Sequence, residues 1–389
     1  MDGPGARMPA AEAHAIVRSA QVVHDRPDAI EHLTAALGPG PMALVAFFVT
    51  PEADFDAVMA EAAGRFPGAE VVGCTTAGEI GAHGYTEGEI VAVALPRANF
   101  RAGTILIEDL DRLDRQELVG RMIRLRRDLM AEAPGMAQEF AFLTVDGLSV
   151  KEDELVAALV GGLGPVPLFG GSAGDGVRYG QTSVSLAGGA MQNAAVLTYL
   201  RTDCRVKVFT LNNFTPTERR MVVTEADPAR RIVRRINAEP AAREYARILG
   251  KDPEQLSSFT FAAHPVVVRF GGTHHVRSIQ RVLDNGDLVF FSAIDEGLVL
   301  TLAEPEDIVT HLARTLDGII GDATPEAILA CDCLLRRIEA QEGQKARAVS
   351  DLLARHRVVG FSTYGEQVGG LHVNQTMTGV ALFAPEDTA

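Results

Sequence analysis

Two cysteines separated by a single residue are the first residues in this sequence whose spacing could do chemistry. Cys331 and Cys333 lie in a predicted strand over residues 327–334, where alternation places both thiols on one face. The pair could bind a metal or act as a redox switch, but two buried core thiols are the more common arrangement. Arg336 and Arg337 follow closely, where they could reach an acidic group of a ligand or lie in solvent.

Two of the ten histidines lie where an imidazole could bind a ligand. His372 lies in the segment 369–376, just after a glycine-rich turn, and His264 precedes a proline in a predicted apolar strand over residues 259–270. A neutral imidazole is a common metal ligand. A single histidine in a loop is also often only a hydrogen-bonded residue, so both interpretations of His372 stay open.

No catalytic or phosphate-binding motif is complete. Residues 170–174 match the Gly-x-Ser-x-Gly pattern of a nucleophile elbow, but that elbow requires a helix directly after the serine, and a strand is predicted instead. The same glycine-rich run lacks the Lys-Ser or Lys-Thr pair of a phosphate-binding loop. The sequence therefore predicts a protein that is not an enzyme.

A seven-residue turn with the pattern Gly-x-[Ser/Thr]-Thr-x-Gly-Glu occurs at residues 73–79 and again at residues 360–366. The two copies align without a gap over residues 71–95 and 358–382, which indicates an internal duplication. The glycines permit a tight turn, and the glutamate could accept hydrogen bonds from the next loop. The turn could be a structural strand exit or the rim of a ligand site.

The two copies differ at one position that could do chemistry: Tyr85 in the first corresponds to His372 in the second. A looser third copy lies between them. Its parts are a strand over 139–145, a helix over 152–163, a strand over 166–169 and a glycine turn over 170–176. The recurring order predicts an α/β fold, in which duplicated strand–helix–strand units form mixed sheets flanked by helices in two domains.

Other elements are predicted from periodicity and turn residues. Helices are expected over 11–37, 230–250 with a break at Pro240, and 305–315, and strands over 259–270, 276–283 and 288–294. Asn285-Gly286 predicts a hairpin between the last two strands. A cluster of arginines within residues 230–235 is interpreted as a solvated helix face.

Composition excludes several kinds of partner. The chain has 389 residues and a formal net charge of −15, which disfavours nucleic acid because phosphates are repelled. No apolar run is long enough to span a bilayer, and no basic head precedes an apolar stretch as in a signal peptide. We therefore expect a cytoplasmic protein with four reduced cysteines and no membrane insertion.

Together these motifs resemble the FIST family, bacterial sensory proteins with paired N- and C-terminal FIST domains. The resemblance implies an N-terminal extension over residues 1–40, expected to be helical, a FIST N-like domain over 41–222 and a FIST C-like domain over 223–389. It rests on residues 73–79, 168–175, Pro240-Ala241 with Tyr245, Val276-Arg277, Asp295-Glu296-Gly297, and 360–366 with Asn374 and Thr376.

Residues 331–337 and 371–376 resemble the haem-binding, nitric-oxide-sensing branch of this family. That branch implies a haem b with His372 as the axial ligand of the iron, His264 as second choice, and Tyr364, Arg336 and Asn374 near the cofactor. It also implies nitric oxide as signal and a histidine kinase, diguanylate cyclase or phosphodiesterase as partner, with a homodimer possible. The alternative that the family implies is a haem-free sensor of a small, amino-acid-like molecule.

Overall fold

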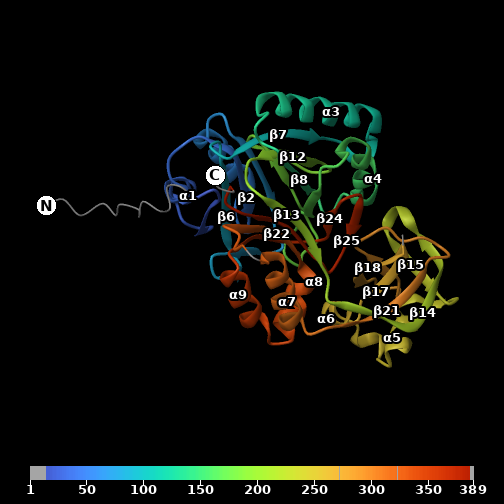
Figure 1. Ribbon diagram of the computed structural model, residues 1–389. Helices are drawn as coiled ribbons and strands as arrows, with labels where there is room; N and C mark the ends of the chain where they lie inside the picture. Colours follow the sequence, from blue (N-terminus) through green and yellow to red (C-terminus); the bar gives the residue numbers. More distant parts are fainter. Residues whose placement is uncertain (1–14, 271, 322, 386–389) are drawn as a thin grey trace.

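The computed structural model describes residues 15–385, except residues 271 and 322. Within this part of the chain, three mixed sheets form the larger body of the molecule (Figure 1). The first sheet is ordered β1 (Arg18–Val23), β6 (Glu89–Pro96), β2 (Met42–Val49), β3 (Glu70–Thr75), β10 (Val184–Leu186), β11 (Gly189–Met191). The second is ordered β25 (Leu371–Val373), β24 (Glu366–Val368), β9 (Leu168–Ser172), β8 (Gln138–Val145), β12 (Ala195–Thr202), β7 (Phe100–Ile107). The third is ordered β13 (Val206–Leu211), β26 (Met377–Leu382), β22 (Ala327–Cys333), β23 (Val358–Thr363), β4 (Glu79–Gly81), β5 (Gly84–Thr86).

Each sheet is built on one of the predicted strand–helix–strand units. The parallel pairs are β2 with β3, β8 with β9 and β22 with β23. The helices that join them are α2 (Phe55–Arg65), α4 (Glu152–Leu163), and α8 (Leu334–Glu342) with α9 (Ala346–Arg355). An antiparallel strand completes each unit, so the sheets are mixed as the sequence predicts.

The three units are locked together by exchanged hairpins. The hairpin that follows each glycine turn leaves its own sheet and adds to the sheet of another unit. Thus β4–β5 pairs with β23, β24–β25 pairs with β9, and β10–β11 pairs with β3. Each unit therefore gives one hairpin and receives one, and the three turns lie close together where the exchange occurs.

A shared apolar core lies between the inner faces of these sheets. Phe48 of the first sheet stacks on Phe361 of the third, with ring centroids 4.6 Å apart, and Phe142 of the second stacks on Phe169 at 5.0 Å. The outer faces are covered by helices, among them α1 (Ala29–Leu37), α3 (Arg115–Glu132) and α7 (Ile308–Ile320). The helix over 305–315 predicted from sequence corresponds to α7.

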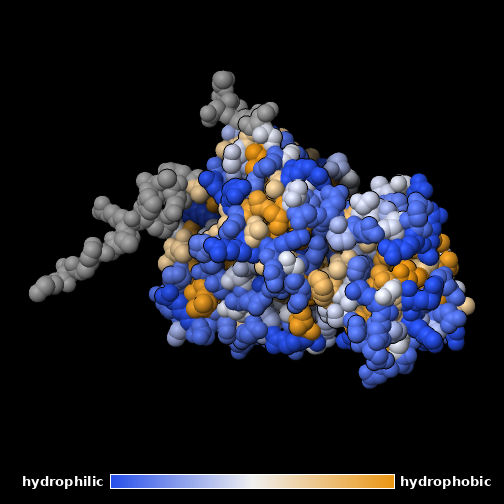
Figure 2. All heavy atoms as spheres, turned by 90° about the horizontal axis from the view of Figure 1, so that it is seen from below, coloured by the Kyte–Doolittle hydropathy of each residue, from blue (hydrophilic) through white to orange (hydrophobic). Residues whose placement is uncertain are grey.

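A separate sheet is inserted between β13 and α7, and it forms the smaller lobe on the right of Figures 1 and 2. Its strands are β14 (Phe214–Asp227), β15 (Ile232–Ile236), β16 (Glu239–Pro240), β17 (Val266–Phe270), β18 (Thr273–Arg277), β19 (Ile279–Val282), β20 (Leu288–Phe290) and β21 (Val299–Pro305), and its helices are α5 (Ala241–Leu249) and α6 (Ser258–Ala263). The predicted hairpin turn at Asn285-Gly286 joins β19 and β20. The predicted boundary between residues 222 and 223 falls inside β14.

Three predicted elements differ from the structure, and one helix of the structure was not predicted. Residues 18–23 form the edge strand β1 rather than part of a helix, because they pair with β6; residues 11–14 of that predicted helix lie outside the described residues. Residues 232–236 form β15, whose arginines pair across the sheet with acidic residues of β14. Residues 258–263 form α6, which a Ser257 capping box begins. The helix α8, directly after β22, was not predicted.

The face drawn in Figure 2 is mostly hydrophilic, with small separate hydrophobic patches. No helix within the described ranges is long and apolar enough to cross a membrane.

Candidate functional site

The three glycine turns contact one another through a cyclic set of backbone hydrogen bonds. In each pair, an amide of one turn donates to a carbonyl of the next, at equivalent positions. The bonds are Gly174 to Thr75 (3.1 Å), Tyr364 to Ser172 (3.2 Å) and Ala77 to Ser362 (2.9 Å). The small residues of the motif permit this close approach. The main structural role of the repeated turn is therefore to join the three units.

The glutamate that ends two of the turns has the same structural role in both. Glu79 accepts a hydrogen bond from Thr76 and, at 3.4 Å, from the Glu89 amide. Glu366 likewise accepts from Thr363 and, at 3.1 Å, from the Thr376 amide. Burial raises the pKa of Glu79 to about 7 and that of Glu366 to about 8. The prediction that this glutamate accepts hydrogen bonds from the next loop is confirmed.

The aligned residues Tyr85 and His372 occupy equivalent hairpin positions but face different surroundings. Tyr85 is paired in register with Ile80, and His372 with Gln367. The Tyr85 hydroxyl donates to Asp332, in the third sheet. His372 instead lies where the second sheet meets the inserted sheet, and only 2% of its surface is exposed.

Both ring nitrogens of His372 have hydrogen-bond partners within the protein. Nδ1 lies 3.1 Å from the side-chain amide of Gln367, and Nε2 lies 3.4 Å from the carbonyl oxygen of Phe291. The His372 carbonyl accepts a 2.8 Å hydrogen bond from Arg277 of the inserted sheet. Burial lowers the pKa of His372 below its ordinary value, so the imidazole is neutral at pH 7.

A buried ion cluster beside His372 joins the inserted sheet to the larger body. Arg231 pairs with Glu152 at 2.7 Å and with Asp153 at 3.1 Å, both in the first turn of α4. Arg277 lies 3.8 Å from Asp153. The side chains of Arg231 and Glu152 are only 6% and 2% exposed. Removing either charge would leave the other buried without a partner, which is strongly destabilising. Any change in how the two lobes meet must therefore act on this cluster.

Three of the residues predicted around a cofactor, His372, Tyr364 and Asn374, lie together. The Asn374 side chain donates to the Tyr364 carbonyl at 3.4 Å and accepts from Ser278 and Ser292 of the inserted sheet. A Cβ built at Gly365 would lie 2.3 Å from the His372 ring, which shows how tightly the imidazole packs against this turn.

The fourth predicted residue, Arg336, lies apart from them. Its guanidinium is fully buried and donates to Asp332 and Asn213, both at 2.7 Å. The alternative that it lies in solvent is wrong, because α8 turns its side chain into the body beneath the Tyr85 hairpin. His264 is half-buried, and its carbonyl accepts a bond from Tyr245.

The cysteine pair is buried. Cys331 belongs to the core shared by the three sheets, and Cys333 packs with Leu334 and Tyr364. Burial raises the pKa of both thiols far above the ordinary range, which keeps them protonated and unreactive. Among the described residues, no group of three or more His, Cys, Asp or Glu side chains is placed to hold a metal ion.

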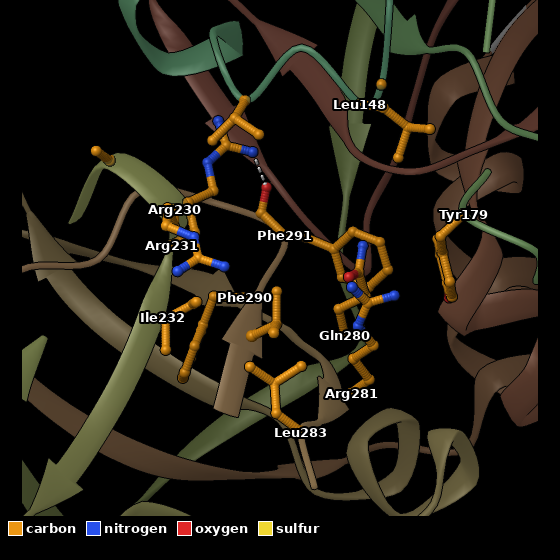
Figure 3. A pocket seen from close by; sticks show the side chains of 14 residues that line it. Leu148, Tyr179, Arg230, Arg231, Ile232, Gln280, Arg281, Leu283, Phe290 and Phe291 are labelled. Carbon is orange, nitrogen blue, oxygen red and sulfur yellow. Dashed lines mark hydrogen bonds between the residues drawn. The ribbon is translucent and has the colours of Figure 1, made fainter. Parts of the chain in front are cut away.

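Two cavities flank the junction of the lobes. The first, of about 330 Å³, is lined by His372, His275, Arg269 and Arg277 together with apolar residues such as Leu298. The second, of about 320 Å³, is shown in Figure 3. Both volumes lie at the lower end of the range of small-molecule sites, roughly 300 to 1,000 Å³.

The donors around the first cavity suit a haem chemically, but their arrangement does not. A neutral imidazole, apolar walls and two arginines are the groups that hold a haem iron and its carboxylates. However, both nitrogens of His372 are already bonded inside the protein, and the cavity is small. As described, the His372 ring has no free nitrogen for an iron atom.

Sequence reasoning missed the ion cluster. Arg231 was interpreted as part of a solvated helix face, whereas its side chain is buried and its backbone has the unusual φ of 55°. Glu152 and Asp153 carry no local sign of a partner, because that partner, Arg231, lies just before β15 and almost eighty residues away along the chain. Arg277 was quoted only as part of a family motif.

Comparison with known proteins defines the class to which the chain belongs, the paired sensory domains of signalling proteins. Residues 43–239 match the FIST N domain, and residues 241–369 match the FIST C domain. The chain belongs to the FIST family. Neither match distinguishes the haem-binding, nitric-oxide-sensing branch from the rest of the family. No curated protein matches the chain.

Proposed function

We propose that this FIST protein senses a small molecule, without haem, in the cavity beside His372. The observation that carries this proposal is the state of the His372 ring. Both of its nitrogens are hydrogen-bonded within the protein, while the adjoining cavity of about 330 Å³ is of small-molecule size. We therefore interpret the ring as part of the wall of a preformed site and not as a metal ligand.

The lining suggests how a ligand would be held. Arg269 and Arg277 present guanidinium groups, His275 presents a second imidazole, and Val268 and Leu298 supply apolar surface. Such a mixture suits an amphipathic molecule of amino-acid size that carries a carboxylate. Arg277 also lies near Asp153, so a ligand carboxylate would compete with this ion pair.

The link to signalling would be the junction between the lobes. A ligand that binds Arg277 more tightly in one arrangement of the lobes shifts the population toward that arrangement. A partner enzyme, such as a histidine kinase or a diguanylate cyclase or phosphodiesterase, would respond to that arrangement. The chain itself would act without catalysis, in the cytoplasm, as a monomer or homodimer.

The test is a thermal-shift screen of the protein as purified, using the common amino acids. A ligand should raise the melting temperature, and Ala293→Phe, which places a ring in the cavity, should abolish that rise. Val299→Phe, which adds a ring at an exposed position of β21 that does not line the cavity, should leave the rise intact. No stabilisation by any compound, or equal loss in both variants, would refute the proposal.

Haem-based sensing of nitric oxide is the second candidate, favoured by the neutral imidazole of His372 in a cavity with two arginines. Here His372 would have to exchange one of its hydrogen bonds for the iron, with Arg269 or Arg277 near the haem carboxylates. A bound haem would supply the iron that binds nitric oxide. A Soret band that appears after expression with haem and is lost in His372→Ala would support this candidate. If the wild-type protein shows no Soret band, the haem-free sensor is the remaining candidate.

A further inference from the structure

The second cavity, of about 320 Å³, lies between the two lobes and has a different chemical character. Leu148 and Tyr179 of the larger body line one side, and Arg230, Arg281 and Phe291 of the inserted sheet line the other (Figure 3). The arginines come from separate segments that precede β15 and form β19, so their meeting at one cavity is a product of the tertiary fold.

These two arginines, Arg230 and Arg281, have no anionic partner within the described parts of the chain. Neither Arg230 nor Arg281 lies within 4.0 Å of a carboxylate there, although the chain carries a net charge of −15. By contrast, Arg234 and Arg235, which lie on β15 shortly after Arg230 in the chain, both pair with Glu225. Positive charge facing a cavity of an acidic protein, where neighbouring arginines are paired, points to an anionic occupant.

Tyr179 provides an independent sign of a ligand. Its hydroxyl is buried, and no described residue forms a hydrogen bond with it. Burial raises the pKa of this phenol, which therefore keeps its proton and can donate a hydrogen bond. The Tyr179 ring lies 5.8 Å from the Phe291 ring, which gives the cavity an aromatic wall.

The backbone is strained on both sides of the cavity. Tyr179 has a φ of 51° and Arg231 a φ of 55°, in the left-handed region that bulky side chains rarely adopt. Such conformations persist only where the surroundings hold them, and they gather at ligand sites. Tyr179 lines the cavity, and the side chain of Arg231 pairs with Glu152 in the ion cluster.

We propose that this cavity is a second ligand site, which binds a small organic anion. Arg230 and Arg281 would bind a carboxylate or phosphate group, since guanidinium groups form paired hydrogen bonds with either. The Tyr179 hydroxyl would donate one more bond, and a flat apolar body would pack on Phe291. Because the lining comes from both lobes, the bound anion stabilises their present arrangement. This site is independent of the ligand at His372.

The test is isothermal titration calorimetry of the full chain in buffer free of carboxylate and phosphate. The probes are benzoate, phenyl phosphate, inorganic phosphate and the neutral analogue benzamide. We expect benzoate or phenyl phosphate to bind and benzamide not to bind. Binding of inorganic phosphate as tightly as phenyl phosphate would show that the aromatic wall has no part, and would overturn the claim of an organic ligand.

Variants separate the site from general charge effects. Arg281→Gln should weaken binding of the anionic probe roughly tenfold or more, because a charge-assisted bond is lost. Arg234→Gln removes the same charge from the same sheet but away from the cavity, and should change the affinity less than about twofold. Tyr179→Phe should weaken binding without altering the fold. Failure of every probe to bind, or equal effects of Arg281→Gln and Arg234→Gln, would overturn the proposal.

Discussion

The glutamate of the repeated turn leads to a sharp prediction about pH. Glu366 is fully buried, and burial raises its pKa from the ordinary value of 4.5 to about 8. Between these values the folded protein keeps a proton that the unfolded chain has released. The free energy of unfolding therefore falls as the pH rises, and the stability present below about pH 4.5 is lost progressively up to about pH 8.

The magnitude follows from the size of the shift. One pKa unit corresponds to about 1.4 kcal/mol, so the slope is about 1.4 kcal/mol per pH unit and the full loss is at most about 5 kcal/mol. Glu79, whose pKa is raised to about 7, contributes a similar slope that ends near pH 7. Buried histidines such as His372 act in the opposite direction, but only below about pH 6.5. The interval from pH 7 to pH 8 thus isolates Glu366.

Urea unfolding at half-unit steps from pH 5.5 to pH 8, followed by circular dichroism, measures these slopes. Glu366→Gln should remove the fall in stability between pH 7 and pH 8. Glu79→Gln, the matched change in the sister turn, should leave that interval unchanged and reduce the slope only below pH 7. A wild-type stability that rises with pH from 7 to 8, or a Glu366→Gln variant with the wild-type slope there, would refute the reasoning.

Three further predictions concern the junction, the thiols and the turn. Arg231→Met should lower the free energy of unfolding by about 3 to 5 kcal/mol in urea titrations, since Glu152 is left buried without its partner, and adding Glu152→Gln should recover part of the loss. Cys331 and Cys333 should react with a thiol reagent only as fast as the protein unfolds, whereas rapid reaction of the native protein would contradict their burial. Gly365→Ala should lower the free energy of unfolding by about 1 to 3 kcal/mol, because the added Cβ would lie 2.3 Å from a carbon of the buried His372 ring. An unchanged melting temperature would contradict that packing.

Much of the α/β body could be predicted because its signals are local. The strand predicted over residues 139–145 and the helix predicted over residues 152–163 have clear apolar patterns of their own, and the structure confirms them as β8 and α4. The duplication was visible because the turn needs glycine and small hydroxyl residues wherever it occurs. Its glutamate could be assigned a hydrogen-bonding role for the same reason: the partners lie within ten residues along the chain.

The errors arose where distant parts of the chain decide the local structure. The segment 18–23 is a strand because β6 pairs with it, and residues 232–236 form a strand because β14 does. Their own side chains are compatible with a helix. Arg336 follows a strand, and a solvated position was one of its two interpretations, yet α8 carries its side chain into the body. Propensity was overridden in each case by pairing or burial that only the folded chain supplies.

By itself, the sequence determined the repeated units, the turn that closes them, and the fact that His372 occupies the repeat position that Tyr85 holds in the first copy. Each of these depends on residues that are neighbours along the chain. Only the tertiary structure decided what surrounds them. Exchange of hairpins places His372 against Phe291 and Tyr85 against Asp332, so equal positions in the repeat have unequal partners. The two cavities likewise exist only where the inserted sheet meets the body, since their walls come from segments far apart in sequence.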